Sequence, residues 1–247
     1  MWELVLGRLE RHHDVLAPTL AGHAGGPPLH GVVDADSLPD GVERAMDAAG
    51  FATAHLAGNS LGGFVALQLA ARGRAESVTA FAPAGGWARG DGSYRDTLDR
   101  FSDMQHMLRI GAAGAAAMTA TPAGRAAALR LLVEDASAVG AELAAHLVQG
   151  AAACPDAAAM IAYAKREGYD LDAARVACPV RVVWGTADRL LEWPRTAQRF
   201  RRDWLPHAEW IELEGVGHCP HLEVPLETAQ LILGMTGAGR SLSPRAR

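Results

Sequence analysis

The sequence predicts an α/β fold, a mostly parallel, doubly wound sheet that is interrupted by an all-helical insertion. Strand-like and helix-like segments alternate at short spacing before residue 85 and again after residue 172. Such alternation requires crossover connections, which make neighbouring strands parallel. Between these two parts no convincing strand occurs. We therefore expect residues 1–84 and 173–237 to form the core, 85–172 a helical insertion, and 238–247 a flexible C-terminal tail.

Before the insertion, the spacing of apolar residues and the residues that end helices predict the secondary structure. A helix is expected where Trp2, Val5, Leu6 and Leu9 share one face, and a strand where the apolar run of His13–Ala17 ends at a proline. Gly50 and Gly73 terminate two further helices. The two helices are expected at Leu38–Gly50 and Ser60–Arg72. A buried strand at Ala54–Ala57 precedes the second helix, and a further strand at Ser77–Ala82 follows it.

Strands resume after Pro179, and the same reasoning places four more elements there. Two short segments have the length and pattern of strands, and each is followed by a segment with helical spacing. In order, we expect a strand at Val180–Trp184, a helix at Pro194–Trp204, a strand at Glu209–Leu213 and a helix at Leu222–Met235.

Charge, cysteines and apolar runs exclude several classes of function. A net charge of −5 argues against nucleic acid as a partner. The longest apolar stretches are broken by polar residues, and the N-terminus lacks the apolar core of a signal peptide, so we expect no membrane association. The three cysteines lie far apart without a CxxC motif, which disfavours a disulfide framework and a zinc site. We expect a cytoplasmic protein.

The strongest local motif is Gly58-Asn59-Ser60-Leu61-Gly62, which lies between a predicted strand and an apolar helix. A serine raised on such a sharp strand-to-helix turn is exposed as a nucleophile, and glycines are needed where helix and strand approach closely. The backbone N–H of Leu61, at the start of the helix, can then stabilise a developing oxyanion. The alternative is that Ser60 is an ordinary helix cap.

A serine nucleophile needs a base, and the base needs an acid to orient it. His218 lies in the loop after the last predicted strand, and Asp188 lies in the loop after Val180–Trp184. Loops at the carboxyl ends of parallel strands are where α/β sheets place their sites. We therefore predict a triad of Ser60, His218 and Asp188, with Asp170 or Asp172 as the next candidates for the acid.

These motifs resemble the α/β-hydrolase superfamily, specifically its lid-bearing serine hydrolases. The matching segments are GNSLGG at 58–63, WGTAD at 184–188 and GVGHCPHLEVP at 215–225. The resemblance implies that Ser60 is the nucleophile, His218 the general base and then acid, and Asp188 its orienting acid. It also implies that the Leu61 N–H is an oxyanion donor and that residues 85–172 form a lid.

In one respect the sequence departs from the superfamily pattern. The superfamily has a strand before the first helix that ends in a His-Gly pair, and its loop supplies a second oxyanion donor. This sequence begins at Met1-Trp2, inside the helix that should follow. We expect either an N-terminally truncated reading of a longer enzyme, which the intact triad favours, or a degenerate member. Loss of one donor costs on the order of 10²–10³ in rate.

Several other residues are candidates for substrate contact. His23 lies on the loop after the first predicted strand, at the expected rim of the pocket. Trp87, Met104 and Met107 are expected to line an apolar pocket under the lid or to form the core of the lid, as are Tyr94, Phe101 and Leu108. His221, three residues after His218, has no third metal ligand nearby, and Cys219 is expected to be a small buried side chain.

The sequence therefore predicts a serine hydrolase that cleaves an ester-like bond through an acyl-enzyme. Its small, hydrophobic substrate would be a carboxylic ester, thioester, lactone or related acyl compound, and neither a metal nor an organic cofactor is implied. A serine at this turn disfavours the dehalogenases and epoxide hydrolases of the superfamily, which place aspartate there. The alternative is a non-catalytic protein of the same fold that binds a ligand. The oligomeric state is open.

Overall fold

The computed structural model describes residues 1–237, so the expected tail at 238–247 lies outside the described residues. Four strands form one sheet in the spatial order β1 (Ala54–Asn59), β2 (Ala75–Phe81), β3 (Val180–Gly185) and β4 (Glu209–Leu213). All three neighbouring pairs are parallel. The predicted fold class, a parallel sheet flanked by helices, is confirmed.

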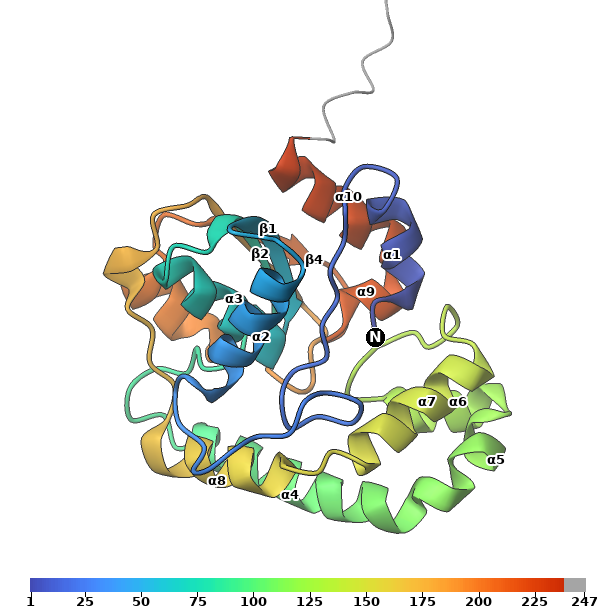
Figure 1. The fold of residues 1–247 in the computed structure, drawn as a ribbon. Coiled ribbons are helices and arrows are strands. Elements are labelled where there is room, and N and C mark those ends of the chain that lie inside the picture. Colours follow the sequence, from blue (N-terminus) through green and yellow to red (C-terminus); the bar gives the residue numbers. More distant parts are fainter. Residues whose placement is uncertain (238–247) are drawn as a thin grey trace, which may run out of the picture.

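Helices cover both faces of this sheet because successive strand residues point to opposite sides. Val78, Ala80 and Trp184 pack in one cluster with Phe64 and Leu67 of α3 (Leu61–Ala71). On the other face, Phe81 and Val183 pack with side chains of α1 (Glu3–Leu9) and α10 (Pro225–Thr236). Figure 1 shows α3 and α2 (Ser37–Ala48) on one side of the strands, with α1 and α10 on the other.

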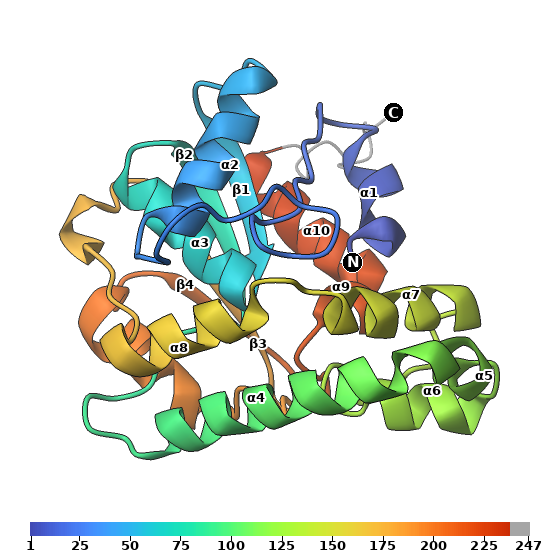
Figure 2. The same cartoon turned by 60° about the horizontal axis from the view of Figure 1, so that its bottom comes forward.

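Between β2 and β3 the described chain is helical. Its α-helices are α4 (Ser93–Gly111), α5 (Ala115–Thr119), α6 (Pro122–Leu129), α7 (Ala141–Ala152) and α8 (Ala157–Glu167), with a 3₁₀ turn at Ala112–Gly114. Figure 2 shows these helices together along one end of the sheet. A separate apolar cluster joins them to the core, because Leu129, Val133 and Ala144 pack against Cys219 and Leu222.

Two predicted elements differ in the structure. The strand predicted at His13–Ala17 is wrong: residues 14–20 have no regular secondary structure, and β1 is an edge strand of the described sheet. A strand needs a neighbour that takes up its backbone hydrogen bonds, and this segment has none within residues 1–237. The helix predicted at Pro194–Trp204 is irregular, with a 3₁₀ turn at Arg195–Ala197 and a π-helical turn at Phe200–Trp204.

None of the helices within residues 1–237 is both long enough and apolar enough to cross a membrane.

The short helix α9 (Pro220–Glu223) contacts α1 through a buried histidine. The His221 ring stacks on Trp2, with ring centroids 4.4 Å apart. Its side chain is 0% exposed, and neither ring nitrogen has a hydrogen-bond partner among the described residues. Burial lowers the pKa of His221 to about 3 from its ordinary value of 6.5, because the charged imidazolium loses its hydration. His221 is therefore neutral in the folded protein.

This burial predicts a specific loss of stability in acid. Below pH 6.5 the unfolded chain protonates His221 while the folded chain does not, until the pH approaches 3. Across that window the free energy of unfolding should fall by up to about 1.4 kcal/mol per pH unit from this residue. His221→Phe, which keeps the stack on Trp2, should flatten the dependence. Urea unfolding between pH 7 and pH 4 measures the free energy of unfolding, and His207→Phe, at an exposed histidine, is the control. An equal pH dependence of this free energy in the parent protein and both variants would refute the account.

Gly58 sets how closely β1 approaches the first turn of α3. A Cβ atom at Gly58 would lie 2.2 Å from the Gly62 carbonyl oxygen and 2.7 Å from the Gly63 nitrogen. Both are backbone atoms, so neither can move aside without shifting the helix. A Cβ atom at Gly62 would meet nothing within 4 Å. The close approach therefore requires glycine at position 58 and not at 62.

Gly58→Ala should lower the free energy of unfolding by at least about 2 kcal/mol, or roughly 4–8 °C in Tm, because strand and helix must separate. Gly62→Ala, the matched control in the same motif, should unfold within about 1 °C of the parent protein. Thermal unfolding of both variants measures the difference. Equal Tm values for the two variants would contradict the packing described here.

Candidate active site

Ser60 is the single residue between β1 and α3, and its backbone is strained. Its φ of 54° and ψ of −121° lie in a region that residues with a side chain rarely adopt. Main-chain hydrogen bonds hold it there: its N–H donates to the Phe81 carbonyl at 2.9 Å, and its carbonyl accepts from Ala84 N–H at 3.0 Å. Both partners belong to β2 or the turn after it, so the neighbouring strand fixes the serine.

Asp188 and His218 form a buried pair. The Asp188 Oδ2 and His218 Nδ1 atoms are 2.8 Å apart, and the residues are 4% and 2% exposed. The other carboxylate oxygen accepts N–H bonds from Leu190 and Leu191, each at 2.8 Å. With both oxygens accepting hydrogen bonds, the carboxylate is held in one orientation and favours a proton on Nδ1. The His218 Nε2 atom is then available to accept a proton.

Asn59 connects the serine turn to the histidine loop. Its amide Nδ2 donates to the His218 carbonyl at 2.9 Å and to the Phe81 carbonyl at 3.2 Å. Its Oδ1 accepts a bond from the Cys219 thiol at 3.4 Å. The residue before Ser60 therefore contacts the loop that carries His218. Within the described residues, no hydrogen bond joins the Ser60 hydroxyl directly to the His218 ring.

The other candidate acids and the neighbouring thiol have different surroundings. Asp170 is paired with Arg199 at 2.9 Å, and its side chain is 84% exposed. Asp172 is exposed, at the start of the 3₁₀ turn Ala173–Arg175. Burial raises the pKa of the Cys219 thiol, which keeps it protonated and a poor nucleophile. No group of three or more metal-ligating His, Cys, Asp or Glu side chains occurs in residues 1–237.

The residues expected to contact substrate are dispersed. Leu61 begins α3, with its N–H at the unpaired end of the helix. His23 is half-buried in its loop, with Nδ1 3.2 Å from the Ala21 carbonyl oxygen. Met104 is half-buried on α4, whereas Met107 is 64% exposed on the same helix. This exposure does not fit an apolar pocket under a lid, because Met107 lies on the solvent face of α4.

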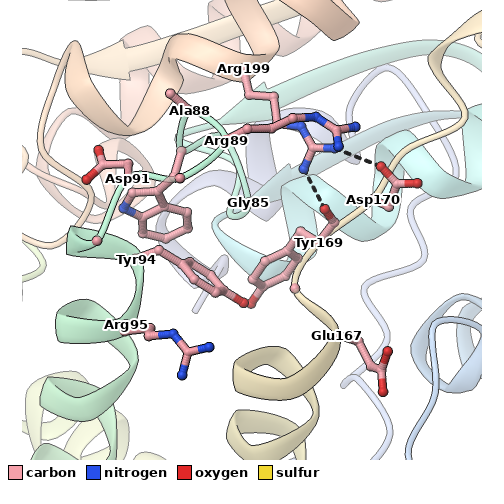
Figure 3. A pocket seen from close by; sticks show the side chains of 14 residues that line it. Gly85, Ala88, Arg89, Asp91, Tyr94, Arg95, Glu167, Tyr169, Asp170 and Arg199 are labelled. Carbon is pink, nitrogen blue, oxygen red and sulfur yellow. Dashed lines mark hydrogen bonds and ion pairs between the residues drawn. The ribbon is translucent and has the colours of Figure 1, made fainter.

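Trp87 and Tyr94 line a cavity of about 510 Å³, but this cavity is polar. Its wall includes charged residues of both signs, namely Arg89, Asp91, Arg95, Glu167, Asp170 and Arg199. Figure 3 shows Tyr94 and Tyr169 pointing toward one another across it, with Arg199 bound to Asp170 and to the Tyr169 carbonyl. Ser60, Asp188 and His218 are not among its lining residues. The cavity is therefore separate from the candidate triad.

Comparison with known proteins identifies the family of this chain. The sequence profile of the Alpha/beta hydrolase family matches residues 1–231. The epoxide hydrolase EphH of Mycobacterium tuberculosis (strain ATCC 25618 / H37Rv) is 33% identical over 196 residues, which is 79% of this chain and 91% of that protein.

Solved structures show the same fold at lower identity. The 2-hydroxy-6-oxo-6-phenylhexa-2,4-dienoate hydrolase of Rhodococcus sp. strain RHA1 superposes with a TM-score of 0.72 at 19% identity, over 96% of this chain and 84% of that one. The enol-lactonase of Burkholderia xenovorans LB400 gives a TM-score of 0.70 at 18% identity, over 96% and 85% of the two chains. The chain belongs to the alpha/beta hydrolase family and is a hydrolase of that fold.

Proposed function

We propose that this hydrolase cleaves an ester-like acyl bond through a covalent acyl-serine intermediate on Ser60. The observation that supports the proposal is the buried Asp188–His218 pair, together with the hydrogen bond from Asn59, the residue before the strained Ser60, to the His218 carbonyl. A nucleophile, a base and an orienting acid on the carboxyl ends of three parallel strands are the components that acyl transfer requires.

In the proposed reaction, Ser60 Oγ attacks the carbonyl carbon of the substrate while His218 Nε2 takes the hydroxyl proton. The Leu61 N–H donates to the resulting oxyanion, and Asp188 stabilises the imidazolium. The C–O or C–S bond to the leaving group then breaks, and the leaving group takes the proton from His218. Water, deprotonated by His218, attacks the acyl-serine, and collapse of the second oxyanion releases a carboxylic acid and restores Ser60.

The name of the EphH relative raises epoxide hydrolysis as a second candidate. The side chain at position 60 argues against it. A serine oxygen that opens an epoxide forms an ether, which has no carbonyl group for water to attack. A carboxylate nucleophile forms an ester, which water can resolve. We therefore propose acyl transfer, with a small hydrophobic acyl compound as substrate, and expect epoxides at most to alkylate Ser60 without turnover.

The first test is covalent labelling. A fluorophosphonate probe should add to Ser60 in the folded protein, and activated aryl esters should be hydrolysed. Ser60→Ala should abolish the adduct and lower kcat at least ~10³-fold. Ser37→Ala, at a half-buried serine on α2, should behave as the parent protein. Mass spectrometry of the digested protein locates the adduct. A folded protein that gives no adduct on Ser60 would instead support a non-catalytic ligand-binding protein.

The second test concerns the orienting acid. Asp188→Asn should lower kcat by roughly 10³–10⁴-fold, because the amide no longer favours the ring tautomer with Nε2 free. Its KM should change little, since the interaction acts on the transition state. Asp172→Asn, an exposed alternative acid, should leave both constants unchanged. Steady-state kinetics with an activated ester measures kcat and KM of both variants. A larger fall in kcat for Asp172→Asn than for Asp188→Asn would make Asp172 the orienting acid.

A further inference from the structure

Glu223 binds three backbone N–H groups from two segments that are far apart in the sequence. Its Oε2 accepts from Gly217 at 2.8 Å and from Glu134 at 3.1 Å. Its Oε1 accepts from Asp135 at 2.9 Å. Gly217 directly precedes His218, whereas Glu134 and Asp135 belong to the turn that follows α6. One carboxylate therefore joins the helices between β2 and β3 to the histidine loop.

The same turn, residues 132–135, also binds the other side of His218. The Cys219 N–H donates to the Leu132 carbonyl oxygen at 2.7 Å. The two backbones lie close together, since a Cβ atom at Gly217 would be 2.8 Å from the Val133 Cα. The turn thus binds Cys219 directly and packs against Gly217, which the Glu223 carboxylate joins to it. The histidine loop cannot shift without breaking these contacts or carrying the turn with it.

The turn contacts the segment that carries the candidate acid as well. Glu134 forms an ion pair with Arg189 at 2.6 Å, and Arg189 follows Asp188 directly. This pair is exposed at both ends, so its contribution to stability is small. The Glu223 hydrogen bonds are stronger because the acceptor is charged. Glu223 is therefore the side chain that chiefly fixes the turn to the histidine loop.

We propose that Glu223 is a positioning residue, which holds His218 in place for catalysis by fixing its loop to the turn at 132–135. The inference rests on the proposed serine-hydrolase function. It assigns the turn after α6 a role in holding the base. Because a misplacement of about 1 Å can cost 10²-fold in rate, a loosened loop lowers kcat even when the fold is retained.

Glu223→Gln tests this directly, because it keeps the shape of the side chain but turns one acceptor into a donor that faces an N–H group. We expect kcat with an activated ester to fall roughly 10–100-fold, with KM within about threefold. Fluorophosphonate labelling of Ser60 should slow to a similar extent. Glu223→Asp, which keeps the charge but is one methylene shorter, should give an intermediate loss. Glu227→Gln, an exposed glutamate four residues on, should match the parent protein.

Amide hydrogen exchange gives a readout that does not depend on activity. The N–H groups of Gly217, Glu134 and Asp135 should exchange faster in Glu223→Gln, while those of the strands are unchanged. An unchanged kcat in Glu223→Gln would overturn the proposal. So would a fall in activity that in both Glu223→Gln and Glu223→Asp only matches the fall in the amount of folded protein. If the parent protein gives no adduct on Ser60, the proposed function fails. Exchange then decides whether Glu223 fixes the loop, and unchanged rates at the three amides would reject that claim too.

Discussion

The candidate site depends on one close approach of backbone to backbone, between Gly58 at the end of β1 and the first turn of α3. This contact leaves room for only one residue between strand and helix, and that residue, Ser60, takes a positive φ. The strain is tolerated because β2 holds the N–H of Ser60 and the turn after β2 holds its carbonyl. The Ser60 backbone, and the Leu61 N–H that follows it, are thereby fixed to the parallel sheet and not to a free loop.

The histidine, by contrast, lies on a loop, and three separate interactions fix it. Asp188 holds its ring, Asn59 binds its carbonyl, and the turn at 132–135 binds Cys219 directly and Gly217 through Glu223. The first two interactions come from the loop after β3 and from the end of β1, and the third comes from the segment inserted between β2 and β3. The insertion therefore contacts the loop of the proposed base, and under our proposal substitutions in this turn alter catalysis without any contact with substrate.

The sequence was sufficient to predict the elements whose pattern is local. β4 has the predicted bounds, and β3 extends the predicted strand by one residue, because short segments with this apolar pattern between helix breakers form strands. The strand at His13–Ala17 failed because a strand needs a partner, which local pattern does not supply. The bonds of Glu223 to Glu134 and Asp135 were missed for a similar reason, since their partners lie 89 and 88 positions apart. Trp87 was expected to line an apolar pocket or the core of the lid, but the cavity that it lines is polar, because charged side chains from separate parts of the chain share its wall.

The central claim is that the oxygen of Ser60, and not a carboxylate, bonds to the substrate. A single turnover of an ester in water enriched in ¹⁸O tests it most directly, followed by digestion and mass measurement of peptides and product. Resolution of an acyl-serine places ¹⁸O in the acid product and leaves every peptide at its natural mass. A carboxylate nucleophile would form a mixed anhydride with the acyl group and gain ¹⁸O when water attacks the carbonyl of the protein. Direct attack of water on the ester would label the product without any acyl-peptide, so a second sample is quenched in acid before turnover is complete. We predict an acylated Ser60 peptide in the early sample and label in the product alone, whereas an early sample without acylated Ser60, or label in a peptide that contains Asp188 or any other carboxylate, would contradict the account.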